Sequence, residues 1–430
     1  MNDFLNLLGR NRNYRFTWMG QIVCEIGDHF NTIAVFSLVM ETTGSGLVVS
    51  GVMLARAIPM VMAGPLAGVV LDRYDRKRIM MASDVIRAII ALAFIATTHY
   101  HKNWLLYMLS ALLMYCSPFF TSGRTSILPT ITSKEELHAA NSLTQTTQWM
   151  TVTIGTMAGG FSAAYLGLQW AFVINSFSFL FSAWCVSQLE VEGSFRPKRR
   201  ALTENRVVRP WHEYREGLSY MKATPLILAI ALVGVGWALG GGAAQILFTL
   251  FGELVFNRGP VGIGVIWGFA GIGLVVGGAI GHSLGKWISF AGYKRLVSAG
   301  FIVHGGAYVA FSQMPTFAGA LFFIALSRVG IAVVTVLNLS QMLRHVDDEF
   351  RGRVFSTAES LLWFTMMVSM TLAGLASEYY DPRTIGLVAG VLSSTAAFVW
   401  AWANWAGKLP EPPELGIDPK DVEIHGEPTV

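Results

Sequence analysis

Two carboxylates, Glu25 and Asp28, lie three residues apart in an otherwise apolar stretch of the chain. On a helix this spacing places both side chains on one face. Two acids this close together in an apolar medium are not both easily ionised, so one of them could load and release a proton. We therefore expect Asp28 and Glu25 to bind a proton or a cationic substrate. In the alternative, Glu25 lies near the interface with water and Asp28 pairs with an arginine.

Further charges interrupt other apolar stretches, where each costs about 3 kcal/mol or more inside a membrane. Arg56 needs a partner, and we expect Asp28 to be that partner because the stretches that hold them are neighbours in the chain. Asp84 and Arg87 are three residues apart, so they can pair on one helix face and serve assembly.

Two more charges are candidates for contact with a ligand. Arg328 can meet an anionic group of a substrate or a backbone carbonyl. Glu359 can line a cavity or interact with Asp72, which lies in a basic loop described below. An apolar, aromatic pocket with few polar anchors is the usual binder of amphipathic molecules. The candidates for lining such a cavity are Asn31, Gln145, Gln148, Trp149, Gln245, Trp267, Asn338 and Trp363.

The composition places these residues in a membrane protein. Of the 430 residues, 53% are hydrophobic and only 13% are charged, whereas a soluble domain has about 25% charged residues. Lipid covers most of a membrane protein, so few charges are needed. Cys24, Cys116 and Cys185 have no paired spacing, which indicates small buried side chains rather than disulfides or metal ligands.

A membrane-crossing helix needs about 20 mostly apolar residues. Twelve stretches meet this requirement: 16–40, 46–71, 79–97, 105–122, 139–164, 169–188, 225–251, 261–284, 295–311, 317–341, 354–376 and 385–406. The sequence therefore predicts an all-α integral membrane protein with two parallel six-helix repeats. We divide it into an N-terminal half (1–190), a cytoplasmic basic linker (191–223), a C-terminal half (224–407) and a flexible tail (408–430).

Connections rich in lysine and arginine alternate along the chain with connections that have few of these residues. The leading segment and the even-numbered connections are basic, whereas the odd-numbered connections hold only Lys102, Arg258 and Arg383. Basic connections stay in the cytoplasm. Both termini are therefore expected in the cytoplasm.

The second connection carries a motif, Gly64-Pro65-Leu66-Ala67-Gly68-Val69-Val70-Leu71-Asp72-Arg73-Tyr74-Asp75-Arg76-Lys77-Arg78. It resembles the signature loop of the major facilitator superfamily, Gly-x-x-x-Asp-Arg-x-Gly-Arg-Arg/Lys, with Asp75 at the second glycine. This variant, the stretch 122–129 and Gly27-Asp28 resemble the branch that contains macrolide-efflux proteins and the enterobactin exporter. The resemblance covers most of the chain and implies the major facilitator fold.

The resemblance implies that this loop is a latch between the halves, which opens during transport. Its residues are Gly68, Asp72, Arg73, Arg76 and Arg78, with Asp84 and Arg87 in the next helix. Asp72 can pair with Arg76 or face a helix N-terminus, and Gly64 and Gly68 would let their helix approach another closely. The alternative is a basic loop that only fixes topology. By family position, Arg124 faces the cavity from the cytoplasmic side.

Two features depart from the family pattern. The antiporter signature in the fifth span usually has a Gly-Pro pair, and this chain has Gly155-Thr156 in the corresponding stretch. The second copy of the signature loop, at 281–286, lacks the acid. The latch is therefore expected on one side only.

Several motifs of enzymes are absent from the sequence. It holds no Gly-x-x-x-x-Gly-Lys-Ser/Thr phosphate loop, no His-Glu-x-x-His metal motif and no Gly-x-Ser-x-Gly nucleophile turn. We expect no enzymatic activity, no cofactor and no metal site. No nucleic-acid partner is expected either, because membrane topology accounts for the basic residues.

These observations predict a proton-coupled secondary transporter of the bacterial cytoplasmic membrane. It would export hydrophobic or amphipathic molecules, such as a drug, macrolide or siderophore, by alternating access, and family resemblance implies a monomer. Protonation of Asp28 would favour one facing state and the substrate the other. Alternatives on the same scaffold are a lipid or lysophospholipid translocator and a ferroportin-like metal exporter. A further alternative is a transport-inactive sensor that binds a partner through 191–223.

Overall fold

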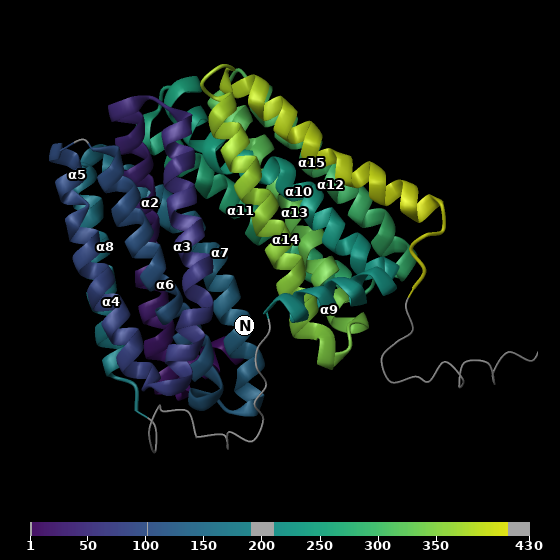
Figure 1. The fold of residues 1–430 in the computed structure, drawn as a ribbon, viewed down its shortest axis with the longest axis horizontal. Helices are drawn as coiled ribbons and strands as arrows, with labels where there is room; N and C mark the ends of the chain where they lie inside the picture. The colour runs from purple at the N-terminus through teal and green to yellow at the C-terminus, as the bar shows by residue number, and fades with distance from the viewer. Residues whose placement is uncertain (1, 101, 191–209, 412–430) are drawn as a thin grey trace, which may run out of the picture.

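The computed structural model describes residues 2–100, 102–190 and 210–411, which form helices without any strand. The helices form two groups that lie side by side (Figure 1). The first group contains α1 (Asn2–Arg10), α2 (Arg12–Thr43), α3 (Gly46–Arg73), α4 (Arg76–Ala93), α5 (Ile95–Tyr100), α6 (Asn103–Ile131), α7 (Lys134–Tyr165) and α8 (Leu168–Ser187).

The second group follows after residues 191–209. It contains α9 (Pro210–Ala223), α10 (Pro225–Leu250), the π-helical turn η1 (Phe251–Val255), α11 (Gly259–Gly285), α12 (Phe290–Gln313), α13 (Phe317–His345), α14 (Asp348–Ala376) and α15 (Pro382–Trp405).

Each predicted span coincides with a long helix or, for 79–97, with the pair α4 and α5. Ten helical segments in the described part of the chain are long and apolar enough to cross a membrane. Helices α7 and α12 are not among them, and α7 carries the polar run Thr144-Gln145-Thr146-Thr147-Gln148. The all-α membrane fold is confirmed, whereas the count of twelve crossing helices and the side of the termini stay predictions.

Capping side chains fix several helix ends. Ser133 and Glu136 form a capping box at the start of α7, in which each side chain binds the backbone N–H of the other. Asn11 accepts a hydrogen bond from the Tyr14 N–H at the start of α2. Its amide also donates to the Ile131 carbonyl at 2.7 Å, which ties the start of α2 to the end of α6.

Glycines bring the two groups into contact where α7 crosses α11. A Cβ on Gly264 would press on the Thr156 carbonyl oxygen and lie 3.0 Å from the Cα of Gly160. Larger residues would hold the two backbones apart, since small residues are what allow membrane helices to approach closely. The Trp149 ring covers Gly278 further along the same crossing.

A second contact between the groups joins the first turns of α3 to the last turns of α14. The Ser45 hydroxyl donates to Glu378 Oε1 at 2.7 Å, and the Ser50 hydroxyl donates to the Met370 carbonyl at 3.0 Å. This contact lies at the end of the bundle opposite the connections 74–75, 286–289 and 346–347, at or beside which Arg73, Lys286 and Arg344 lie. We call the end with these connections the basic end and the other the outer end.

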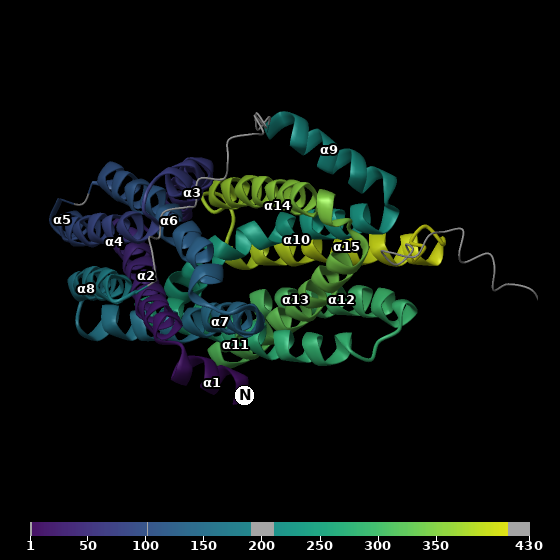
Figure 2. The same cartoon turned by 90° about the horizontal axis from the view of Figure 1, so that it is seen from below.

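Three segments outside the predicted spans also have defined structure. Residues 2–10 form α1, whose Leu7 is buried. The predicted linker ends in the helix α9, which lies along α14 (Figure 2) and pairs Glu216 with Arg353 at 3.3 Å. The predicted tail is docked at its start, where Leu409 is buried and its carbonyl accepts a hydrogen bond from Lys294. Residues 191–209 and 412–430 lie outside the described part of the chain.

Candidate functional site

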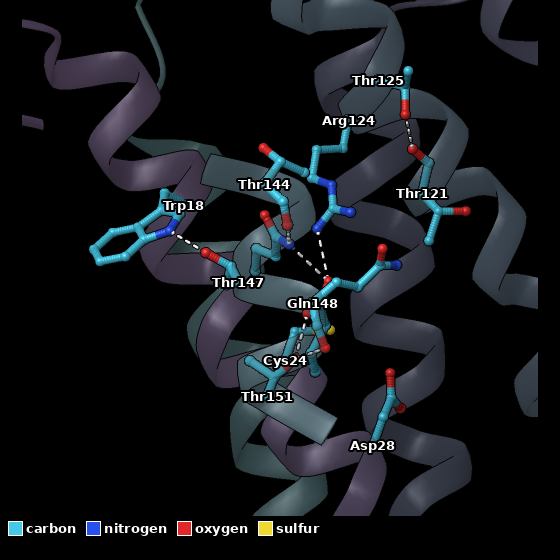
Figure 3. A network of polar contacts seen from close by, with 12 residues as sticks. Trp18, Cys24, Asp28, Thr121, Arg124, Thr125, Thr144, Thr147, Gln148 and Thr151 are labelled. Carbon is cyan, nitrogen blue, oxygen red and sulfur yellow. Dashed lines mark hydrogen bonds and ion pairs between the residues drawn. The ribbon is translucent and has the colours of Figure 1, made fainter. Parts of the chain in front are cut away.

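The two acids on α2 each bind a different arginine. Glu25 receives three hydrogen bonds, from Arg124 at 3.2 Å, Gln21 at 2.9 Å and Thr151 at 2.8 Å. Figure 3 shows Arg124 and Thr151 converging on this part of α2, with Asp28 lying apart from them. The acids therefore do not share one site, although they lie on one side of the helix as expected.

Asp28 pairs with Arg87 of α4. Arg87 Nη2 donates to Asp28 Oδ2 at 2.8 Å, and Nη1 donates to Asp84 Oδ1 at 3.2 Å. The guanidinium also lies over the Phe179 ring of α8, 4.0 Å from its centroid. The predicted pairing of Asp84 with Arg87 is confirmed. Asp28 pairs with an arginine, which is one of the two parts of the alternative given above. We call Asp28, Asp84 and Arg87 the α2–α4 triad.

Burial differs within the triad. Arg87 and Asp84 have side chains that are 1% and 0% exposed, whereas the side chain of Asp28 is 25% exposed. The second oxygen of Asp28, Oδ1, is buried and has no hydrogen-bond partner among the described residues. Asp28 is therefore the most exposed member of the triad, and, like Asp84, it has one carboxylate oxygen without a hydrogen-bond partner among the described residues.

Arg56 has other partners than we expected. Its guanidinium donates to Asn31 Oδ1 at 3.3 Å and to the Thr32 hydroxyl at 2.9 Å. The prediction that Asp28 is its direct partner is wrong, because Arg87 occupies the carboxylate from α4. Asn31 is fully buried and accepts a hydrogen bond from Arg56, so it does not line an open cavity.

A cavity of about 610 Å³ lies in the second group. Its walls come from α10, α11, α13 and α14, with Phe301 of α12 and Val152 of α7. Most of the lining is aliphatic or aromatic, as in typical pockets for small molecules. Of the predicted ligand-contact and lining residues, five are brought together here: Gln245, Trp267, Arg328, Asn338 and Glu359. We call this space the main cavity.

The other cavity candidates lie elsewhere. Trp149 packs on Gly278 at the α7–α11 crossing, and Trp363 donates a long hydrogen bond of 3.4 Å to Glu359. Gln145 and Gln148 are exposed on α7. None of these four lines the main cavity.

The signature loop is held within the first group. Arg76 lies 3.9 Å from Asp72 and donates to the Ser126 carbonyl at 2.8 Å, and Lys77 donates to the carbonyls of Ser187 and Leu189 at the end of α8. Asp72 is 77% exposed, and Arg73 and Arg78 are exposed as well. Within the part of the chain that the structure describes, no ion pair joins these residues to the second group, so Glu359 and Asp72 do not form the network we considered.

Gly64 and Gly68 do not mediate a close helix contact in this structure. A Cβ at either position would meet no atom within 4 Å. The expected approach of another helix to these glycines is thus not present. The second group contacts α3 at the outer end of that helix instead.

Sequence analysis missed Trp237, which lines the main cavity from α10. A tryptophan in mid-span, away from the lipid–water interface, was the available signal. It also missed Gln21 and Thr151, which hold Glu25. No spacing pattern in the sequence joins α2 to α7 at these positions.

The sequence model of the family described as the Major Facilitator Superfamily matches residues 18–358 of this chain. Macrolide efflux protein A of Streptococcus pyogenes is 22% identical over 396 residues, which cover 91% of this chain and 96% of that protein. BacE of Bacillus subtilis (strain 168), which is named as a bacilysin exporter, is 24% identical over 384 residues, 87% of this chain and 91% of BacE.

A solved structure of a mutant of the nucleoside transporter NupG has the same fold. It superimposes with a TM-score of 0.71 at 12% identity and covers 91% of this chain and 99% of NupG.

Proposed function

The chain belongs to the Major Facilitator Superfamily and is a multi-pass membrane transporter, and we propose that it is a proton-coupled exporter of amphipathic small molecules. The observation that carries the proposal is the main cavity, whose volume of about 610 Å³ and largely apolar lining suit a drug-sized molecule. The names of two relatives, a macrolide efflux protein and a bacilysin exporter, support export as the direction.

The arrangement of the two groups supports alternating access. They touch through α3 and α14 at the outer end, whereas the main cavity extends to Met342 and Phe355, near the basic end. We propose that the basic end faces the cytoplasm, as the distribution of Lys and Arg predicts. In this orientation the cavity loads from the cytoplasm, and rocking of the groups opens it to the other side.

The α2–α4 triad supports proton coupling. When Asp28 takes up a proton it loses its charge-assisted bond to Arg87, but Arg87 keeps Asp84 as a counter-ion. Protonation therefore does not leave a buried guanidinium alone, which would be costly in the membrane. Glu25 serves less well as the proton site, because three donors already hold its carboxylate.

The test is proton release on addition of substrate to the purified protein, across a panel of dyes, macrolides, siderophores and lysolipids. We expect release with the wild type and with Glu25→Gln, and none with Asp28→Asn. The Glu25→Gln variant is the matched control, since it changes an acid one helical turn away. Substrate binding without proton release in the wild type would overturn proton antiport. Retained release in Asp28→Asn would remove Asp28 from the coupling.

A further inference from the structure

Arg328 of α13 is a buried cation without an acidic partner. The residue is 7% exposed and lines the main cavity. Within the described part of the chain, no carboxylate lies within ion-pair distance of it and no side chain or carbonyl accepts a hydrogen bond from it. By contrast, Arg87 and Arg124 pair with acids, and Arg56 is held by two hydrogen bonds.

The surroundings of Arg328 do not neutralise its charge. Its guanidinium lies 5.2 Å from the centroid of the Phe248 ring, and a cation–π contact offsets part of the burial cost. The neighbouring Tyr308 hydroxyl is buried and has no hydrogen-bond partner among the described residues, and His304 is engaged by the hydroxyl of Ser327 at 2.8 Å. None of these groups carries a negative charge at neutral pH.

From this we propose that Arg328 binds an anionic head group, such as a carboxylate, of the amphipathic substrate. The inference rests on the proposed function and specifies the chemical class of its substrate. An unpaired charge inside a membrane protein is expensive, and it is retained where it contacts a ligand or a pathway. A guanidinium offers two parallel N–H donors to a carboxylate or phosphate, which suits it to this role.

Two further donors in the same cavity lack acceptors. The indole nitrogens of Trp237 and Trp267 are buried and have no hydrogen-bond partner among the described residues, and both tryptophans line the main cavity. Buried donors without an acceptor cost free energy.

Glu359 orients such a substrate. At about 1.5 Å per residue, Glu359 lies about 16 Å from the basic end of α14, and Arg328 lies about 25 Å from the basic end of α13. The acid therefore lies nearer the basic end, where it repels an anionic head group and favours its position at Arg328. Between them, aliphatic and aromatic side chains such as Leu274, Ile331, Val334 and Leu362 can cover an apolar body.

The test compares two probes that share the pyrene body and chain length but differ in the head group, the anionic 1-pyrenebutyrate and the neutral alcohol 1-pyrenebutanol. Binding to the protein in lipid nanodiscs is followed by energy transfer from tryptophan to pyrene, and empty nanodiscs correct for partition into lipid. We expect the wild type to prefer the carboxylate by about tenfold or more, which corresponds to about 1.4 kcal/mol. Arg328→Gln should lose this preference and still bind the alcohol.

Two more variants sharpen the assignment. Arg328→Lys keeps the charge but not the two parallel donors, so it should retain part of the preference. Arg258→Gln is the matched control, because Arg258 is an exposed arginine outside the cavity, and it should behave as the wild type.

The outcomes separate the inference from the proposed function. Equal binding of the two probes by the wild type, or a preference that survives Arg328→Gln, would overturn the role of Arg328 and leave the cavity as a binding site. If neither probe binds folded wild-type protein, the cavity does not take amphipathic molecules of this size. That result would overturn both.

Discussion

Arg87 of α4 reaches across to α2 and binds Asp28 with a distance of 2.8 Å between Nη2 and Oδ2. The same guanidinium holds Asp84, three residues before it on its own helix. A single buried cation therefore serves two carboxylates from two helices. This relationship links the stability of the first group of helices to the protonation state of Asp28, and it leads to the first prediction.

Arg87→Met should destabilise the protein strongly. The change leaves Asp84, and most of Asp28, buried without a counter-ion, and breaking a buried pair from one side costs about 3–5 kcal/mol. The measurement is the thermal midpoint of the purified protein in detergent. The control is Arg12→Ala, which breaks an exposed pair with Glu190 at 2.8 Å and should cost about 0–1 kcal/mol. Equal midpoints for the two variants would contradict the triad's structural importance.

Gly264→Leu should separate α7 from α11 and impair both stability and transport. A Cβ there would already press on the Thr156 carbonyl oxygen and approach Gly160, and overpacking of this kind costs about 1–3 kcal/mol. Thermal midpoint and transport rate would be compared with Gly306→Leu, since a Cβ on Gly306 of α12 meets nothing within 4 Å. A Gly264 variant as stable and active as the Gly306 variant would show that close approach at this crossing is not required.

Gly68→Trp should fold normally but transport poorly. The position is open in this structure, so the new side chain clashes with nothing here, and the thermal midpoint should stay near that of the wild type. If the basic end closes during transport, the bulky side chain obstructs closure, and we expect the rate to fall about tenfold or more. Ala82→Trp, at an exposed position on α4, controls for the added tryptophan. Wild-type transport by Gly68→Trp would argue against closure at this site.

The start of α15 should become less protected at low pH. The Thr384 hydroxyl, at 2.6 Å, and the N–H groups of Thr384 and Arg383 hold the pKa of Asp381 below its usual value. A lowered pKa means that the carboxylate stabilises this cap above about pH 4. The contribution disappears as the pH falls through the pKa of the folded state.

Hydrogen exchange of the amides of residues 383–386 measures this effect. Asp381→Ala at pH 7 should increase exchange of these amides by about twofold to tenfold, in keeping with the loss of an N-cap. The variant should also lose the extra pH dependence of the wild type. Unchanged exchange in the variant would show that the cap does not hold this helix end.

The positions of the helices could be predicted from the sequence because they depend on local properties. Runs of about 20 apolar residues mark the spans, and caps such as Ser133 with Glu136 are encoded three residues apart. The pairing of Asp84 with Arg87 was predictable for the same reason, since both lie on one helix face.

Partners on different helices could not be predicted in this way. Asp28 was assigned to Arg56 because their helices are neighbours in the chain, yet Arg87 binds it from α4. Which long side chain reaches a given acid depends on the rotation and spacing of helices within the group, to within a few ångströms. Helix α9 was overlooked because its charged surface is typical of a linker, and its docking on α14 requires Gly217 to lie close to Arg353.

The crossing of Gly160 and Gly264 lies close to the outer end of α7, which finishes at Tyr165. If the two groups rock about this point, the parts of α7 on either side of it differ greatly in length. The part toward the basic end has about 26 residues, or about 39 Å, and the part toward the outer end has about 5 residues, or about 8 Å. A displacement of the outer end by a few ångströms would then swing the basic end several times further, so small rearrangements around Ser45 and Glu378 could control a wide opening.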